Sequence, residues 1–233
     1  MTADLAKINA AAAALDFIKD GMVVGLGTGS TSAHFIRLLG ERVRQGLSVR
    51  GVPTSEATRA LAEQVGVPLI DISRVAQIDV DVDGADEVDP GFRLIKGGGG
   101  ALLREKIVAA ASAHMVVIGD ESKAVDVLGA FPLPIEVTRF GFAITARRVY
   151  EALRATNCAG HGVVLRVSGK ANEPVITDGG NYILDAHAKA IHAPDALAAA
   201  LKQIPGVVEH GLFIGLARTF ILGQAVGAEI REA

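Results

Sequence analysis

Residues 22–39, MVVGLGTGSTSAHFIRLL, have the pattern of a strand, a glycine turn and a helix. The apolar run at 22–26 predicts a short buried strand, the glycines after it predict a tight turn, and 34–39 has the composition of a helix. The same order of strand and helix returns at 47–52 and 55–65. Because strands that alternate with helices build parallel βαβ units, this stretch predicts an α/β protein.

The neighbouring sequence offers more elements of the same kind. Apolar residues recur at helical spacing from residue 5 to residue 18, and Gly21 is placed to end that helix. Short apolar runs at 67–70, 78–82 and 115–118 predict further strands. We therefore expect a Rossmann-like, mostly parallel, doubly wound sheet.

The character of the sequence changes at FPLPIEVTRFG, which places two prolines close together. Helical patterns at 144–154 and 195–202 then alternate with strand-like runs in the order strand, helix, two strands, helix. This order predicts a smaller α+β domain of the split βαβ, ferredoxin-like type. We expect residues 1–130 plus 206–233 to form the α/β domain and 131–205 the small domain.

The composition limits the class of protein. With 233 residues, of which 50% are hydrophobic and 21% charged, the chain can bury a substantial core. The net charge of -3 and the lack of a basic cluster argue against binding to nucleic acid or to an acidic membrane. Cys158 is the only cysteine, which rules out an intrachain disulfide and suits a reducing cytoplasm. No apolar run approaches the roughly 18 residues of a membrane span, and the N-terminal residues do not resemble an export signal.

The glycine turn GLGTGST, at 25–31, fails the two nucleotide-binding motifs that it resembles. Ser30 stands where GxGxxG needs its third glycine, and no GK[ST] ending makes the turn a P-loop. The turn still offers backbone amides and the hydroxyls of Thr28, Ser30 and Thr31 near a helix start, where they can bind a phosphate or sugar oxygen. The alternative is that Ser30 or Thr31 merely caps the helix.

The acidic stretch IDVDVDGADEVDP, at 78–90, resembles the first half of a calcium-binding EF-hand loop. The resemblance fails at the twelfth position, where Pro90 replaces the required glutamate. If the stretch begins as a strand, Asp83 lies at the carboxyl end of that strand, where open α/β sheets bind their ligands. Asp83 and Asp86 are therefore the candidates for chemistry. We expect the other acidic residues to be solvated or capping carboxylates, namely Asp79, Asp81, Glu87 and Asp89.

The stretch KGGGGALLREK, at 96–106, sets Lys96 and Glu105 on either side of four glycines. Ordering consecutive glycines costs backbone entropy, so a fold usually keeps them where the backbone approaches another group closely. The residues that follow favour a helix, whose first amides attract anions. The alternatives are a flexible loop, and a solvated helix face on which Glu105 pairs with Arg104 or Lys106.

Together these motifs resemble the ribose-5-phosphate isomerases of the A type. The shared motifs stand in that family's order and at close to its spacing: GTGST (27–31), VDGADE (82–87), KGGGGALLREK (96–106), DESK (120–123), FPLPIEV (131–137), TDGGNYILD (177–185) and PGVVEHGLF (205–213). Gly100 and Leu103 depart from the family's glycine-loop pattern, and IGLARTFIL after Phe213 is more apolar than its usual tail.

The resemblance implies an aldose–ketose isomerase of the non-oxidative pentose phosphate pathway. It would interconvert D-ribose 5-phosphate and D-ribulose 5-phosphate through a cis-enediolate, with no metal and no cofactor. Glu105 would be the general base that moves a proton between C2 and C1. Lys96 and the amides of the glycine loop would stabilise the charge that develops on the carbonyl oxygen. Asp83 would serve ring opening and the oxygen protons, while Asp86 positions hydroxyls.

Other residues are expected to hold the substrate. Lys123 would supply additional positive charge, and Lys7 is a candidate for the phosphate. The expected substrate-binding residues are Thr28, Gly29, Ser30, Thr31, Asp83, Gly84, Ala85, Asp86, Lys96, Gly97, Gly98, Gly99 and Lys123. We assign no role to the six histidines.

Two rival functions are open at this point. An aminosugar-phosphate deaminase or a coenzyme A transferase could share the glycine turn and the carboxylate, and a sugar-phosphate sensor domain of a regulator could share the sheet. The sensor should also carry a basic helix-turn-helix module, for which the chain leaves no room before residue 22. We expect a sugar phosphate as the partner, neither nucleic acid nor membrane, and a cytoplasmic homodimer or dimer of dimers.

Overall fold

The computed structural model describes residues 2–169 and 171–233. The chain forms two compact units. The larger unit consists of Met1–Ala85, Arg104–Ala124 and Gly215–Ala233, and the smaller of Asp86–Leu103 and Val125–Ile214.

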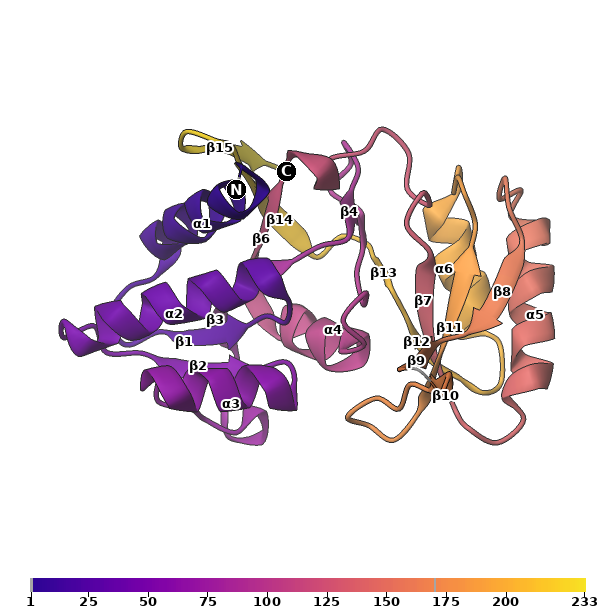
Figure 1. Cartoon of the computed structure of the whole chain (residues 1–233), viewed down its shortest axis with the longest axis horizontal. Helices are drawn as coiled ribbons and strands as arrows, with labels where there is room; N and C mark the ends of the chain where they lie inside the picture. Colours follow the sequence, from indigo (N-terminus) through magenta and orange to yellow (C-terminus); the bar gives the residue numbers. More distant parts are fainter. Residues whose placement is uncertain (1, 170) are drawn as a thin grey trace. The chain divides into compact units, whose positions relative to one another are not determined.

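A six-stranded sheet forms the centre of the larger unit (Figure 1). Its strand order is β15-β14-β6-β3-β1-β2, and every neighbouring pair is parallel except β14 with β15. The strands are β1 (Val23–Leu26), β2 (Arg50–Pro53), β3 (Ile78–Gly84), β6 (Ser112–Asp120), β14 (Ala217–Gly223) and β15 (Ala228–Glu232). This sheet confirms the predicted mostly parallel α/β fold.

Helices cover both faces of this sheet, as in a doubly wound fold. The helices are α1 (Thr2–Ala14), α2 (Ser30–Arg44), α3 (Glu56–Val65) and α4 (Leu102–Ala110). Ala10 of α1, Leu39 of α2 and Ala62 of α3 belong to one core cluster with Val24 and other strand residues. Val108 of α4 packs instead with Val23, whose side chain leaves the opposite face of β1. One strand therefore sends adjacent valines into two apolar layers.

The ends of these helices follow local signals in the sequence. The Ser55 side chain accepts a hydrogen bond from the Thr58 amide and caps α3, and Gly66 ends the helix with a φ of 82°. Gly21 likewise has a positive φ, after the short 3-10 helix η1 (Leu15–Phe17) that extends α1. The expected strand at 67–70 is wrong, since only a single bridge joins Gly51 to Leu69. Pro68 has no amide to extend a ladder there.

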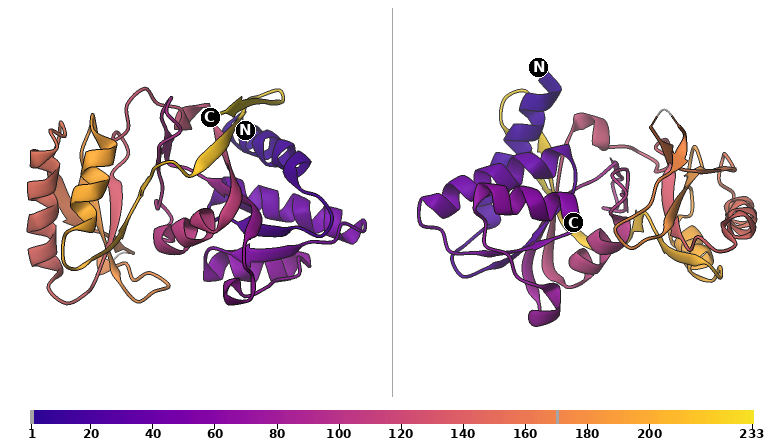
Figure 2. Two further views of the ribbon diagram at one scale, coloured as in Figure 1. Left: turned by 180° about the vertical axis from the view of Figure 1, so that it is seen from behind. Right: turned by 60° about the horizontal axis from the view of Figure 1, so that its bottom comes forward.

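The smaller unit contains a four-stranded antiparallel sheet with the order β12-β7-β11-β8. Its strands are β7 (Leu133–Val137), β8 (Gly162–Leu165), β11 (Tyr182–His187) and β12 (Val207–His210), and its helices are α5 (Phe142–Ala155) and α6 (Pro194–Lys202). Both helices pack against the sheet beside one another (Figure 2). The chain order β7, α5, β8, β11, α6, β12 confirms the predicted ferredoxin-like arrangement.

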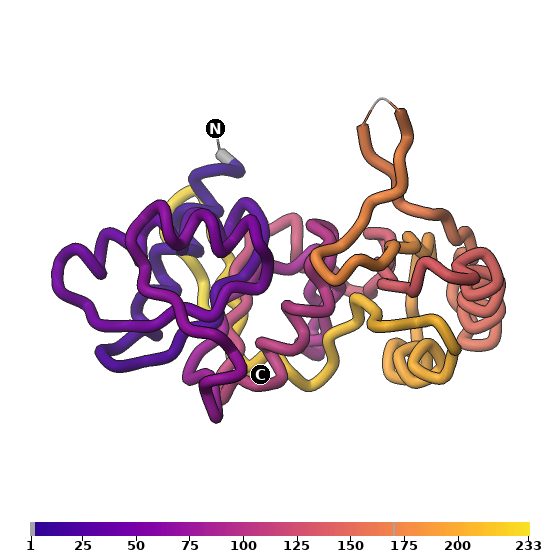
Figure 3. Tube along the Cα trace, turned by 90° about the horizontal axis from the view of Figure 1, so that it is seen from below, coloured from indigo at the N-terminus to yellow at the C-terminus, as the bar shows by residue number. Residues whose placement is uncertain are grey.

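Two smaller β structures complete this unit. One is a three-stranded antiparallel sheet with the order β13-β5-β4, formed by β4 (Glu87–Val88), β5 (Leu94–Ile95) and β13 (Leu212–Phe213). The other is the hairpin of β9 (Val167–Ser168) and β10 (Glu173–Pro174), which projects from the unit in Figure 3. Besides η1, the larger unit contains the short 3-10 helices η2 (Ile72–Arg74) and η3 (Glu121–Lys123).

The chain returns to the larger unit at Gly215, later than the expected residue 206. The physical reason is β12, which pairs with β7 and so keeps residues 207–210 in the smaller unit's sheet. Compact units need not coincide with domains that fold independently. The division into domains at 1–130 plus 206–233 and at 131–205 therefore stays a prediction. Over the described residues, no helix has both the length and the apolar content needed to cross a bilayer.

Candidate active site

The carboxyl ends of β1, β3 and β6 meet at one edge of the larger sheet. After β1 the chain forms β2 on one side of it and then crosses to form β3 on the other side, so the strand order reverses at β1. Open α/β sheets bind their ligands in the crevice at such a reversal. The motifs GTGST, VDGADE and DESK follow or end these strands, so each lies where the topology favours a ligand.

Asp83 ends β3 in a buried position against the glycine turn, with 0% of the residue exposed. Its Oδ1 accepts hydrogen bonds from the amides of Thr28 at 3.0 Å and Gly84 at 2.7 Å, and the Ser32 hydroxyl lies at 3.3 Å. A Cβ at Gly27 would lie 2.1 Å from the same oxygen. Glycine is therefore required at position 27 because Asp83 occupies the space of a side chain.

Asp81 is a buried residue for which the sequence interpretation is wrong, since we expected a solvated or capping carboxylate. It is 0% exposed, and a Cβ at Gly25 would lie 2.5 Å from its Oδ1. Helices cover both faces of a doubly wound sheet, so even the residues that alternate with the apolar ones become buried. The signal available in the sequence was the pair of glycines at 25, in β1, and at 27, just after it, which lie opposite Asp81 and Asp83 of β3.

Each of the remaining acidic residues of this stretch accepts hydrogen bonds from backbone amides. Asp79 is exposed and accepts a hydrogen bond from the Val23 amide. Glu87 and Asp89 are buried and hold backbone instead of contacting solvent. Glu87 accepts from the amides of Gly129 and Phe131, and Asp89 from those of Gly91 and Arg93. Neither carboxylate is solvated and neither caps a helix, so the expected role of a solvated or capping carboxylate is wrong for both.

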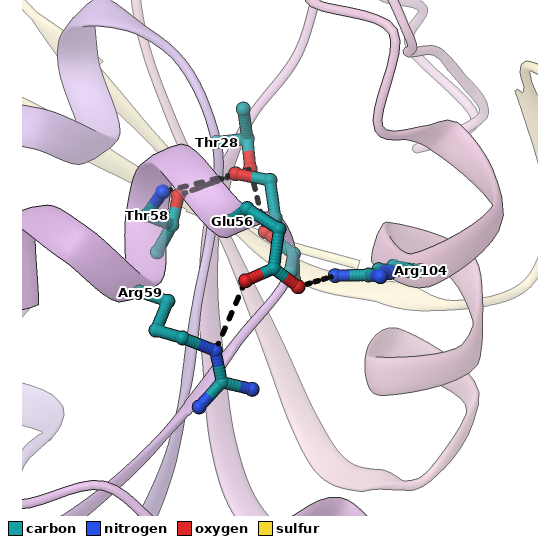
Figure 4. Close-up of polar contacts among 7 residues, drawn as sticks. Thr28, Glu56, Thr58, Arg59 and Arg104 are labelled. Carbon is teal, nitrogen blue, oxygen red and sulfur yellow. Dashed lines mark hydrogen bonds and ion pairs between the residues drawn. The ribbon is translucent and has the colours of Figure 1, made fainter. Parts of the chain in front are cut away.

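The Thr28 hydroxyl lies in a network of protein hydroxyls at the start of α3 (Figure 4). Its Oγ1 lies 2.8 Å from both Thr54 Oγ1 and Ser55 Oγ, and 3.1 Å from Thr58 Oγ1. Thr58 in turn donates to the Gly27 carbonyl at 2.9 Å. These contacts join the glycine turn to the first turn of α3, and the expected contact of Thr28 with substrate stays a prediction.

The start of α2 does not use a hydroxyl cap. Gly29 is the N-cap, with a φ of 128°, so the alternative that Ser30 or Thr31 caps this helix is wrong. Lys7 Nζ donates to Ser30 Oγ at 3.1 Å, which brings the candidate phosphate ligand beside the hydroxyl turn. Thr31 is buried, and Lys123 is partly buried in η3 at the end of β6.

Glu105 lies in the first turn of α4 and is only 3% exposed. The alternative of a solvated helix face is therefore wrong. The neighbouring Arg104 reaches α3 instead, where its Nη1 lies 2.6 Å from Oε1 of Glu56 (Figure 4). This hydrogen bond lowers the pKa of the Glu56 carboxyl, opposed by partial burial and assisted by the charges of Arg104 and Arg59. The α3 start thus contacts both the glycine turn and α4.

Lys96 follows β5 in the smaller unit and is 2% exposed, so it is no ordinary surface lysine. Its amide donates to the Gly211 carbonyl at 2.9 Å, and its Nζ lies 5.4 Å from the centre of the Phe213 ring. An ammonium over an aromatic face gains electrostatic stabilisation. The backbone and the aromatic contact together fix a buried positive charge beside the glycine loop.

The glycine loop at 97–100 is ordered by contacts on both sides, so the flexible-loop alternative is wrong. Asp86 Oδ2 accepts from the Gly98 amide at 2.8 Å, and a Cβ at Gly98 would lie 2.6 Å from Asp86 Oδ1. Gly97 has a φ of 102°, which favours glycine, and the Gly100 amide returns to the Gly97 carbonyl at 3.0 Å. On the other side Arg166, which sequence reasoning did not single out, donates to the Gly97 and Gly98 carbonyls.

The structure also bears on metals and nucleophiles. Within 2–169 and 171–233, no group of three or more His, Cys, Asp or Glu side chains is placed to hold a metal ion. Cys158 is buried in the smaller unit's core, where desolvation raises the pKa of its thiol and leaves it protonated at neutral pH.

The fold and these residues define a class: an α/β protein whose strand order reverses at β1, with buried carboxylates at the carboxyl ends of its strands and a glycine loop beside a buried lysine. Comparison with known proteins agrees with that class. The sequence model of the family described as ribose 5-phosphate isomerase A (phosphoriboisomerase A) matches residues 50–227. The ribose-5-phosphate isomerase A of Maricaulis maris is 58% identical over 100% of both chains, and that of Nitrobacter hamburgensis is 57% identical over 100% of this chain and 99% of its own.

Comparison with solved structures also finds ribose 5-phosphate isomerases. A D-ribose-5-phosphate isomerase in complex with phospho-erythronic acid superposes with a TM-score of 0.92 at 42% identity, covering 100% of both chains. The ribose 5-phosphate isomerase A of Methanocaldococcus jannaschii superposes with a TM-score of 0.90 at 40% identity, covering 98% of each. The chain belongs to the ribose 5-phosphate isomerase A family.

Proposed function

We propose that this chain interconverts D-ribose 5-phosphate and D-ribulose 5-phosphate through a cis-enediolate, with Glu105 as the general base. The isomerisation follows from the family match over most of the chain and from full-length identities of 57–58% to relatives of that name. Membership of the same family places this reaction in the pentose phosphate pathway. The observation that supports Glu105 is its burial at 3% exposure in the first turn of α4, since a carboxylate withdrawn from water there has a use other than solubility.

The proton transfer needs one base that serves two neighbouring carbons. Glu105 removes the proton from C2 of the open-chain aldose and returns it to C1, so one carboxylate is enough for both halves of the reaction. Charge develops on the carbonyl oxygen as the proton leaves. Lys96 and the amides of the glycine loop stabilise that charge, because groups already fixed in place need no reorganisation when it appears. The burial and the ring contact of Lys96 support this role.

The aspartates and the hydroxyl turn hold the substrate. Asp83 assists ring opening and the transfer of oxygen protons, and Asp86 positions hydroxyls; Asp83 lies at a carboxyl strand end of the kind that binds ligands. Ser30, Thr31, Lys7 and Lys123 bind the phosphate or sugar oxygens. The hydrogen bond from Lys7 to Ser30 supports the grouping of a cation with hydroxyls at the start of α2.

The cellular compartment and the oligomeric state of the enzyme are separate proposals. A lone cysteine suits a reducing compartment, so we place the protein in the cytoplasm.

A hydrophobic content of 50% favours a homodimer or a dimer of dimers. Light scattering during size-exclusion chromatography measures the assembly mass directly, and a monomer of 24.1 kDa would contradict the proposal.

The function is tested by a direct assay with purified protein. We expect ribulose 5-phosphate to form from ribose 5-phosphate until the two sugars reach equilibrium from either side. Glucosamine 6-phosphate serves as the control substrate, because ammonia release from it would identify the rival deaminase. Failure to isomerise either pentose phosphate would contradict the proposal.

A further inference from the structure

The geometry points to Arg166 as a positioning residue that sets the direction of the glycine-loop amides, with Asp185 as its anchor. The inference rests on the proposed role of those amides in the isomerisation. Arg166 follows β8 at the base of the β9–β10 hairpin, and its amide donates to the Ile183 carbonyl of β11 at 2.8 Å. Asp185 lies two residues further along β11.

The ion pair of Arg166 and Asp185 holds the Arg166 guanidinium in one orientation. Arg166 Nε donates to Asp185 Oδ2 at 2.9 Å, and Nη2 donates to Oδ1, which makes the contact bidentate. The two side chains are only 15% and 18% exposed. A bidentate pair that is largely shielded from water fixes the plane of the guanidinium far better than a single exposed contact does. The remaining amino group, Nη1, therefore points in one fixed direction.

That amino group holds two consecutive peptide carbonyls of the glycine loop. Nη1 donates to the Gly97 carbonyl and to the Gly98 carbonyl, each at 3.0 Å. An amino group of guanidinium carries two hydrogens, one for each carbonyl. Glycines have the widest choice of backbone conformation, so the two contacts restrict peptide groups that have no side chains of their own to hold them.

Holding the carbonyls also directs the amides. In a trans peptide the C=O and the N–H of one peptide group point in opposite directions. When both carbonyls face Arg166, the amides of Gly98 and Gly99 must face away from it. The Gly98 amide shows this arrangement, since it donates to Asp86 on the opposite side of the loop at 2.8 Å. A positive charge at the carbonyl end of a peptide also strengthens its N–H as a donor.

Substitution of Arg166 should therefore affect the transition state more than the bound substrate. For Arg166→Lys, which keeps the charge but loses the planar fork, we expect kcat to fall about 10- to 100-fold with KM within about threefold, since loss of a whole oxyanion donor costs about 10²- to 10³-fold. Affinity for phospho-erythronic acid, whose carboxylate imitates an enediolate, should fall by a similar factor. Affinity for ribitol 5-phosphate, which has no such group, should stay within about threefold.

The matched control is Arg231→Lys. Arg231 makes the same kind of bidentate pair, with Nε and Nη2 at 2.8 and 3.1 Å from Glu229, but it lies on β15 in the larger unit and the pair is exposed. Its substitution should change neither kcat nor either affinity. Hydrogen exchange gives a readout that does not depend on activity: Arg166→Lys should speed exchange in peptides covering residues 97–100, and Arg231→Lys should not.

The results distinguish a failure of the proposed isomerase function from a failure of the positioning role of Arg166. If the wild type does not isomerise ribose 5-phosphate, the proposed function fails, and hydrogen exchange alone tests whether Arg166 orders the loop. If the wild type is active and Arg166→Lys keeps kcat within about twofold, or loses both affinities equally, the positioning role is wrong. If Arg166→Lys does not fold, Asp185→Asn carries the test: it should show the same selective loss of kcat, and an unchanged kcat would overturn the inference.

Discussion

Burial sets the proposed functional residues apart from the other charged side chains of the protein. Lys96, Glu105 and Asp83 belong to residue types that normally stay exposed, yet each is at most 3% exposed. The motifs in the sequence identified them as candidates, but the sequence could not reveal their burial, because burial depends on which distant elements pack over each side chain. The burial of Asp81 was missed in the same way, since nothing within the acidic run distinguishes its environment from that of exposed Asp79. Arg166 was missed because its partners lie 19 and about 70 residues away in the chain.

Glu105→Gln should abolish isomerisation while leaving sugar-phosphate binding nearly intact. The amide keeps the size of the carboxylate but cannot accept the C2 proton, and general-base catalysis contributes about 10²- to 10⁴-fold. The measurement is kcat together with the affinity for ribitol 5-phosphate. Glu63→Gln makes the same change on the exposed surface of α3 and should behave as wild type. A Glu105→Gln enzyme within about tenfold of wild-type kcat would remove Glu105 from the role.

Lys96→Met should mainly lower kcat, whereas Thr31→Val should mainly weaken ligand binding. In the proposed mechanism Lys96 stabilises charge that exists only in the transition state, so its loss should lower kcat far more than the affinity for ribitol 5-phosphate. The Thr31 hydroxyl, at the start of α2, is proposed to contact substrate in the ground and transition states alike, so its loss should weaken binding with little change in kcat. Calorimetry and saturation kinetics on both variants measure the difference. If Lys96→Met lost affinity with kcat unchanged, the lysine would be a phosphate ligand.

At the scale of elements, strands and helices were predictable wherever apolar periodicity and capping residues agreed. Alternating βαβ signals gave the parallel sheet, and Ser55 and Gly66 mark both ends of α3. The failures came where pairing partners lie far apart in the chain. Residues 67–70 look like a strand, but Pro68 interrupts the ladder, and β12 looks like the return to the large sheet, but its partner is β7. Local sequence does not encode which distant strand a short apolar run will join.

Gly27→Ala tests the packing of β1 against β3. Its Cβ would lie 2.1 Å from Asp83 Oδ1 and 2.6 Å from Asp83 Cα, so one strand end must move. Overpacking of this kind costs about 1–3 kcal/mol in the free energy of unfolding, and the displaced Asp83 should also lower kcat. The control is Gly162→Ala in β8, where a Cβ would meet its nearest neighbour at an ordinary 3.5 Å. Urea unfolding compares the two, and equal midpoints would contradict the close approach.

At the scale of the whole molecule, the reaction is assigned to side chains and backbone amides alone. The carboxylates that might suggest a metal are committed elsewhere: Glu87 and Asp89 hold backbone amides of the smaller unit, and Asp83 holds those of Thr28 and Gly84. Prolonged dialysis against EDTA should therefore leave kcat unchanged. Loss of activity on chelation, with recovery by one particular divalent ion, would show that the proton-handling roles of Asp83 and Asp86 are wrong.

The chain is proposed to isomerise ribose 5-phosphate by moving a proton through an enediolate. The most direct test is to follow ribose 5-phosphate by NMR with the purified wild-type protein in D₂O. We predict ribulose 5-phosphate as the product, with solvent deuterium at C1, because a base that holds the proton between two carbons exchanges part of it with water. No ribulose 5-phosphate, or ribulose 5-phosphate whose C1 carries no solvent deuterium at any stage, would contradict the account.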